Sequence, residues 1–197
     1  MFTVESTKDN LPVIISELIV LTYDDKFKPS CSRNRANVVL PGYALLLKGQ
    51  LSVPKRFSLK NNTFVKLSVR KRGGSLYCDH GKSTVWFFPN RYCAIDLCNF
   101  IGDELCEVIE KVGNHTVNEI VDKTNFNPKL KLPDPPCLVI FCLTDLFGGE
   151  WEFDVFVEYK GNTVLRFRLP AREKYLQVSA ETTEYDDDND CDDEDDE

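Results

Sequence analysis

Residues 151–169 have the sequence WEFDVFVEYKGNTVLRFRL, and this stretch decides the fold class. Apolar and polar residues alternate on either side of Lys160-Gly161-Asn162, as they do in strands that bury one face. The first half places on one face Trp151, Phe153, Val155, Val157 and Tyr159. The second half places Leu165, Phe167 and Leu169 on one face and Val164, Arg166 and Arg168 on the other. The short turn between the halves predicts an antiparallel β-hairpin.

Five other segments are rich in β-branched and aromatic residues and are separated by Gly, Pro, Asn or Asp. They are residues 17–24, 43–53, 64–72, 83–88 and 137–144. Residues 103–111 predict a helix that opens with acids, closes with Lys111 and is followed by Gly113, and residues 116–124 predict a weaker helical turn. Together these elements predict an all-β fold, an immunoglobulin-like antiparallel β-sandwich or cup of two sheets with one short helix.

The formal charge of −8 is concentrated at the C-terminus. Residues 181–197 contain twelve acids and no base; without those twelve, the chain's 32 acids fall to 20, against 24 lysines and arginines. A run of like charges with few apolar residues cannot bury enough surface to fold. The sequence therefore predicts a β-sandwich domain over residues 1–178 and a disordered acidic tail over residues 179–197. The tail is interpreted as a solvating segment, a binding segment for basic proteins, or a lid over the chain's own cations.

Eight cysteines are many for a chain of 197 residues, and seven of them precede the acidic tail. Cys93 and Cys98 are close enough in sequence to close a small loop, which stabilises a fold by roughly 2 kcal/mol. A bridge from Cys106 to Cys137 or Cys142 would contribute more, because it would tie the predicted helix to the central strands.

A zinc site is the alternative use of these residues. Its ligands would be Cys78, His80, Cys93 and Cys98, but their spacing contains no Cys-x2-Cys pair. The sequence therefore favours disulfides. We expect them at Cys93, Cys98, Cys106 and Cys137. The partners of the other cysteines stay open; these are Cys31, Cys78, Cys142 and Cys191.

The compartment is indicated by two sets of features that disagree. The cysteines and two glycosylation sequons, at Asn61 and Asn114, favour a secreted or endolysosomal protein. Residues 1–10, however, carry Glu5 and Asp9 where a signal peptide needs positive charge. The chain is therefore expected to be exported with its leader already removed, and the alternative is a cytoplasmic or nuclear protein.

The order of features along residues 18–169 resembles the ML lipid-recognition family. A Pro-Gly turn and a strand, VVLPGYALLLKGQLSVPKRF, precede FVKLSVRK. The cysteine-rich segment YCAIDLCNFIGDELCEVI and the proline-rich PKLKLPDPPC follow, and the hairpin GGEWEFDVFVEYKGNTVLRFRL comes last. Within the family the likeness is greatest to the ganglioside activator proteins. It implies a secreted or lysosomal β-cup that holds lipid acyl chains between two sheets.

The resemblance has one clear departure. The family usually bridges its first cysteine to one in the last strand. Cys31 could take the first part, but residues 163–170 contain no cysteine.

A lipid-binding cup would need an apolar lining and a place of contact with membranes. The lining residues that we expect are Phe100, Ile101, Leu105, Val108, Leu143, Leu146, Phe147, Trp151 and Phe153. Membrane contact at the mouth is expected from Trp86, Phe87 and Phe88, because three consecutive rings before Pro89 cannot all face one core. The alternative is that these three rings form the end of an ordinary core strand.

The predicted function is therefore lipid binding or lipid transfer, with a glycolipid, phospholipid or sterol as partner and with no cofactor and no metal. No enzyme is expected, since the two histidines, His80 and His115, lie in polar, loop-like sequence and no catalytic motif is present. Nucleic acid is not expected as a partner, because the acidic tail would repel phosphate. The alternative function is an intracellular β-sandwich chaperone or interaction module that binds basic proteins through its tail.

Overall fold

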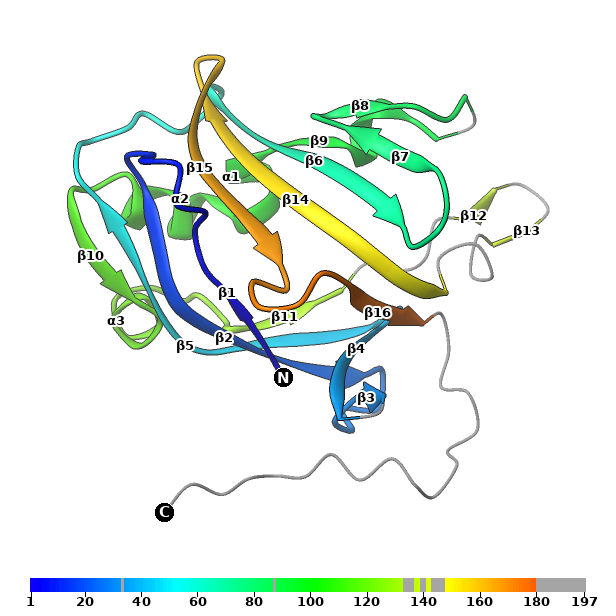
Figure 1. The fold of residues 1–197 in the computed structure, drawn as a ribbon. Helices are drawn as coiled ribbons and strands as arrows, with labels where there is room; N and C mark the ends of the chain where they lie inside the picture. The colour runs from blue at the N-terminus through cyan, green and yellow to red at the C-terminus, as the bar shows by residue number, and fades with distance from the viewer. Residues whose placement is uncertain (33, 87, 133–136, 139–140, 143–147, 180–197) are drawn as a thin grey trace.

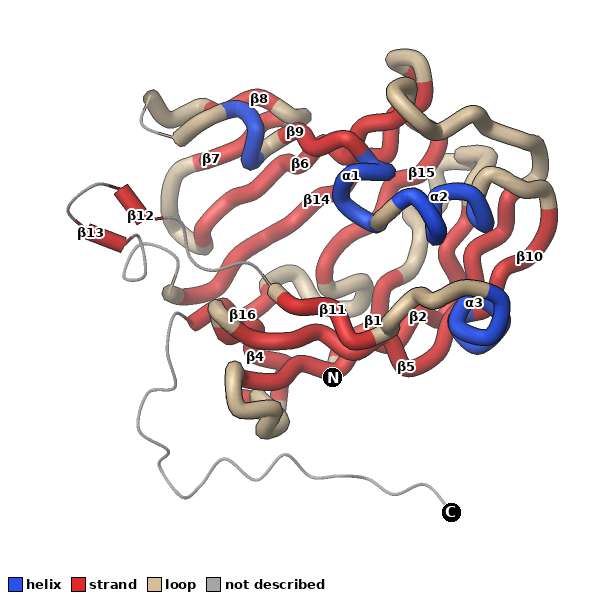
Figure 2. The backbone as a smooth tube through the Cα atoms, turned by 180° about the vertical axis from the view of Figure 1, so that it is seen from behind, coloured by secondary structure: helices blue, strands red, loops and turns tan. Residues whose placement is uncertain are grey.

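The computed structural model describes residues 1–179 except 33, 87, 133–136, 139–140 and 143–147. The described residues form two main β-sheets that face one another, with three short helices on the side turned to the viewer in Figure 2. The prediction of an all-β, two-sheet sandwich is confirmed. Of the predicted acidic tail, Ser179 lies in a strand, and residues 180–197 lie outside the described residues.

The first sheet has the strand order β1-β2-β5-β10, and β11 pairs with β5 as well (Figure 1). Its strands are β1 (Phe2–Val4), β2 (Ile14–Asp24), β5 (Gly42–Val53), β10 (Gly113–Thr116) and β11 (Lys129–Lys131). Strand β5 is long enough to pair with β2 along one edge and, along the other, with β11 near its start and β10 near its end. This arrangement makes β5 the centre of the first sheet.

The second sheet has the order β3-β4-β16-β14-β6-β7-β8, with β15 also on β14 and β9 also on β6. Its strands are β3 (Cys31–Ser32), β4 (Arg35–Val39), β6 (Thr63–Lys71), β7 (Leu76–Asp79), β8 (Lys82–Ser83), β9 (Ala94–Asp96), β14 (Gly149–Tyr159), β15 (Asn162–Leu169) and β16 (Leu176–Ser179). The pairing is antiparallel apart from that of β16 with β4, which is parallel. Among the described strands, this parallel pair is the departure from the expected antiparallel pairing.

The hairpin β14–β15 confirms the prediction for residues 151–169. Its turn has positive φ at Lys160 (50°) and Gly161 (79°), as a two-residue hairpin turn of the primed type requires. The expectation that Val164 faces away from Leu165 is wrong. The register pairs Val157 with Leu165 and Glu158 with Thr163, so Val164 is the extra residue of a β-bulge. Both Val164 and Leu165 are buried as a result.

Apolar side chains are packed together on the second sheet at the end where β14 begins. Trp151 is 1% exposed and packs with Val69, Val178 and the bridged Cys78 and Cys93. Half-buried residues of β4, β6, β7 and β14 pack around this group. We call it the Trp151 cluster; it continues the apolar inner face of β14.

Two predicted strands have a different structure. Of the described residues in 83–88, only Ser83 is in a strand, and Phe88 donates its backbone N–H to the Val85 carbonyl in a turn. The run of large apolar residues there does not alternate with polar ones, and the proline that follows removes a backbone donor. Residues 137–144 contain two short antiparallel strands, β12 (Cys137–Leu138) and β13 (Phe141–Cys142), in place of one long strand.

The helices are α1 (Leu97–Ile101), α2 (Asp103–Ile109) and α3 (Val117–Lys123), with a 3-10 turn η1 (Asn90–Tyr92) before β9. The predicted helix 103–111 is α2, and the predicted turn 116–124 is α3. In α3 the Thr116 side chain accepts from the Glu119 N–H, and Glu119 pairs with Lys123. Helix α1 was not expected, because five residues are too few for a helical repeat to be visible.

Cys93, Cys98 and Cys106 form disulfides as predicted, but not with the partners considered from the sequence, which were Cys93 with Cys98 and Cys106 with Cys137 or Cys142. The bridges are Cys78–Cys93 and Cys98–Cys106, each with 5.5 Å between Cα atoms. Cys93 lies close to Cys78 because β7 and the residues before β9 pair along the same edge of β6. Helices α1 and α2 fold back on one another at Gly102, which brings Cys98 to Cys106.

For Cys31 and Cys137 the disulfide partners are not described. Cys31 is disulfide-bonded as well, and its partner is none of the four bridged cysteines just named. A bridge at Cys137 stays a prediction.

Removing the bridge between α1 and α2 should lower the free energy of unfolding. For the double variant Cys98→Ala/Cys106→Ala we expect a loss of about 2–3 kcal/mol, since the closed loop is short. The variant Cys78→Ala/Cys93→Ala, with a separation of 15 residues, should lose about 3 kcal/mol. Urea unfolding without reductant measures both losses, and an unchanged midpoint in either variant would contradict the pairing.

Candidate functional site

An apolar cavity of about 550 Å³ lies between the inner faces of the two sheets, beyond the Trp151 cluster. A volume of this size is typical of a site for a small molecule. Apart from Gly49, Gln50 and His115, every residue that lines it has an aliphatic or aromatic side chain. No carboxylate, lysine or arginine is among the described lining residues.

One wall of the cavity is the inner face of the second sheet. The cross-strand row Val65, Val157 and Leu165 lies beside the row Leu67, Val155 and Phe167. Residues directly opposite one another in neighbouring strands share a face, so both rows point toward the first sheet. The alternation seen in the sequence of the hairpin therefore produces this wall.

The opposite wall comes from the first sheet, and the helices form a side. From the first sheet the lining includes Ile15, Leu18, Leu46, Leu51 and Val53, and Val13 lines it from the segment just before β2. From the helices it includes Leu97, Phe100 and Ile101 of α1, Leu105 and Ile109 of α2, and Val117 and Ile120 of α3. Spacings of three and four residues place these side chains on one face of each helix.

Helix α2 is held in position from two sides. The Leu59 N–H donates to the Glu110 carboxylate at the end of α2 (2.8 Å), and the Cys98–Cys106 bridge ties α2 to α1. Both cysteines are buried in the same apolar cluster as Leu97. The helix is therefore a fixed part of the wall.

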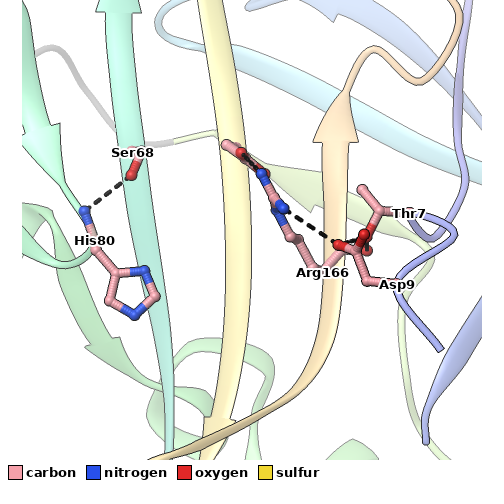
Figure 3. Close-up of polar contacts among 6 residues, drawn as sticks. Thr7, Asp9, Ser68, His80 and Arg166 are labelled. Carbon is pink, nitrogen blue, oxygen red and sulfur yellow. Dashed lines mark hydrogen bonds and ion pairs between the residues drawn. The ribbon is translucent and has the colours of Figure 1, made fainter. Parts of the chain in front are cut away.

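The segment before β2 closes the seam between the two sheets. Thr7 donates its N–H to the Arg166 carbonyl (2.9 Å), and Val13 donates to the Val164 carbonyl (3.0 Å). The Arg166 guanidinium binds Asp154 and Asp9, and Thr7 donates to the Asp9 carboxylate (Figure 3). The hydrogen bond from Thr7, with Arg166 adding to it, lowers the pKa of Asp9. This seam keeps the N-terminal segment on β15.

The predicted lining residues are placed as follows. Four of them line the cavity, namely Phe100, Ile101, Leu105 and Phe153. Trp151 does not line it, because the inner face of β14 continues past the cavity into the Trp151 cluster. Val108 does not line it, because Leu105 and Ile109 occupy the face of α2 toward the cavity. Leu143, Leu146 and Phe147 lie outside the described residues.

The predicted membrane-contact residues are separated by the fold. Trp86 is 95% exposed, while Phe88 is half-buried against the Trp151 cluster; Phe87 lies outside the described residues. In both views the loop after β8 lies at the end of the molecule away from α3 (Figures 1 and 2). The exposed ring that borders the cavity is Phe100, with 63% of its surface exposed. Membrane contact by Trp86 stays a prediction.

Both predicted glycosylation positions are accessible. Asn61 is exposed in the turn before β6, and Asn114 is exposed on β10. Glycosylation itself stays a prediction for both.

A cluster of polar side chains lies on the outer face of the second sheet. Glu158, whose side chain is 8% exposed, contacts the Lys66 ammonium (2.5 Å) and His80 Nε2 (2.6 Å). His80 also donates its backbone N–H to the Ser68 hydroxyl (Figure 3). Burial alone would raise the pKa of Glu158, but Lys66 and His80 outweigh it, so the pKa is lowered from its usual 4.5.

The structure removes the zinc alternative. Cys78, Cys93 and Cys98 are bridged and cannot ligate a metal as thiolates, and His80 is engaged with Glu158. Within the described ranges, no group of three or more His, Cys, Asp or Glu side chains could hold a metal ion. None of the helices found there is long and apolar enough to cross a bilayer.

No family model matches the chain, and no curated protein matches it. The resemblance to the ML family therefore stays a prediction.

Replacing Glu158 should change how stability depends on pH. Because the folded pKa is lowered, the carboxylate stabilises the fold fully above about pH 4.5, and this contribution is lost as pH falls through the folded pKa. We expect Glu158→Gln to lower the free energy of unfolding by about 1–3 kcal/mol near neutral pH.

The difference between wild type and Glu158→Gln should shrink on acidification from about pH 6 to about pH 3. Thermal unfolding across this range measures it. Glu152→Gln, on the same face of β14, is the matched control and should show a small difference that varies less with pH. A Glu158→Gln difference that is constant with pH would contradict the assignment.

Proposed function

We propose that the protein binds the hydrocarbon part of a lipid in the cavity between its two sheets. The observation that supports the proposal is the cavity itself, about 550 Å³ in volume with an almost wholly apolar wall. Such a wall offers water too few hydrogen-bond partners to hold it well. An apolar ligand of matching size is the occupant that this chemistry favours.

The energetics favour an occupied cavity. An enclosed apolar cavity of this volume left empty would cost on the order of 10 kcal/mol, comparable to the whole stability of a domain, and this is the upper limit for a cavity that is open to solvent. Burying a sixteen-carbon chain contributes on the order of 12 kcal/mol at about 0.8 kcal/mol per methylene. The two quantities are of the same size, so lipid and fold stabilise one another.

Exchange of such a ligand needs contact with a membrane. Phe100 supports this step, because its exposed ring borders the cavity at the end of α1. One inserted ring contributes about 1.5–3 kcal/mol, which makes the contact reversible. We therefore propose lipid transfer, with loading and release at a membrane surface.

The bridges Cys78–Cys93 and Cys98–Cys106 support an oxidising compartment. We propose a secreted or endolysosomal location on this basis. The alternative function, binding of basic proteins through the acidic tail, concerns residues 181–197, which lie outside the described residues.

Filling the cavity should abolish lipid binding without unfolding the chain. In Leu105→Trp the indole would occupy part of the cavity, and we expect at least a tenfold loss of affinity for hexadecanoyl lipids. Val108→Trp is the matched control, because Val108 is half-buried on the same helix but does not line the cavity. Native mass spectrometry of the purified proteins measures the lipid that each retains.

Two outcomes would contradict the proposal. One is a wild-type protein that retains no lipid and takes up none from vesicles. The other is equal loss of binding in the two tryptophan variants. Deletion of residues 181–197 should leave lipid binding unchanged, and loss of binding after this deletion would favour a role for the tail.

The point of membrane contact can be tested by comparing two exposed rings. We expect Phe100→Ser to slow lipid transfer between vesicles by about tenfold, since about 1.4 kcal/mol of inserted apolar surface is lost. Trp86→Ser should slow transfer only if the loop after β8 contacts the membrane too. Fluorescent lipid transfer between vesicles measures the rate, and an unchanged rate in Phe100→Ser would exclude contact at α1.

A further inference from the structure

His115 is a polar residue within the apolar wall of the cavity. It lies on β10 directly opposite Leu51 of β5, and both residues line the cavity. The residue is only 8% exposed. An imidazole in such a place needs an explanation. Among the other described lining residues, Gln50 is the one with a polar side chain.

One ring nitrogen of His115 has a fixed role. Nε2 lies 2.8 Å from the Lys111 carbonyl, and a carbonyl can only accept. Nε2 therefore carries a hydrogen and donates it. In the neutral imidazole the other nitrogen, Nδ1, then has a lone pair, and it finds no hydrogen-bond donor among the described residues.

The other polar side chain beside the cavity does not compete for this role. Gln50 lies opposite Ser16 and Thr116 in the register, and both of those residues are exposed. Its position corresponds to the outer face of β5, whereas Leu51 and His115 lie on the inner face. Among the polar side chains of the described cavity wall, His115 is thus the one whose unpaired acceptor, Nδ1, we expect a ligand to reach.

We propose that His115 selects lipids with a free hydroxyl group, whose O–H donates to Nδ1 at the buried end of the ligand. This inference rests on the proposed function and names the ligand class. Ester, ether and ketone oxygens only accept, so they would leave Nδ1 unpaired. A carboxylate is also only an acceptor, and it would lose its hydration in an apolar wall.

The wild-type protein can be tested with three ligands of one chain length. They are 1-hexadecanol, 1-methoxyhexadecane and hexadecanoate, each used to displace N-phenyl-1-naphthylamine from the cavity. One net hydrogen bond to a neutral group corresponds to about a fivefold preference. We therefore expect the alcohol to bind about fivefold more tightly than its methyl ether, and more tightly than the carboxylate.

The variant His115→Leu should bring the ratio of alcohol to ether affinity to about one while it keeps the affinity for the ether. Ile109→Leu, another lining position, is the control and should keep the ratio. A merely structural role of His115 would weaken both ligands equally and leave the ratio unchanged. The wild-type ratio needs no variant, so the inference stays testable if His115→Leu does not fold.

The outcomes separate this inference from the proposed function. A wild type that binds alcohol and ether equally overturns the role of His115 while lipid binding stands. Preference for hexadecanoate overturns the hydroxyl class and indicates a protonated imidazole that donates from Nδ1. If none of the three ligands displaces the probe, the proposed function fails.

Discussion

The extent of the cavity depends on the Trp151 cluster, which covers the inner face of the second sheet where β14 begins. Trp151 is buried there beside Val178 and the Cys78–Cys93 bridge. Strand β14 runs from this cluster into the cavity wall, so its inner face is packed at one end and borders a hollow at the other. Side chains in the wall cannot close the hollow unless the packed end is disturbed, because protein interiors resist deformation.

The remaining sides of the hollow are fixed by polar and covalent contacts that apolar packing alone would not supply. Helix α2 is tied to α1 by a disulfide and to the Leu59 loop by the Glu110 carboxylate. The seam at β15 is held by backbone hydrogen bonds from Thr7 and Val13. Each contact anchors an element at its end and leaves its apolar face toward the cavity. The contacts that hold these elements in place are therefore polar or covalent, whereas the side chains that line the cavity are apolar.

The sequence predicted those elements whose residue pattern lies within one continuous segment. The hairpin of residues 151–169 was predicted because alternation and a turn signal agree over nineteen positions. The lining residue Phe153 followed from it and Leu105 from the predicted helix α2. The bulge at Val164, the five-residue helix α1 and the cysteine pairing were not predicted. Cys78 meets Cys93 only because both lie along one edge of β6, and His115 lies in a four-residue strand whose alternation is too short to recognise. These features depend on contacts between segments far apart in sequence.

Charged and apolar side chains lie on opposite faces of the same strands. On β14, Asp154 and Glu158 point outward to Arg166, Lys66 and His80, while Val155 and Val157 point into the cavity. Asp154 and Glu158 are thus paired with cations of the same sheet, and the described cavity wall contains no carboxylate, lysine or arginine. A charged headgroup would meet no counterion inside and would lose its hydration there. Under the proposed function, the neutral part of a lipid is therefore the part suited to the interior, and a charged group would stay at the solvent-exposed edge.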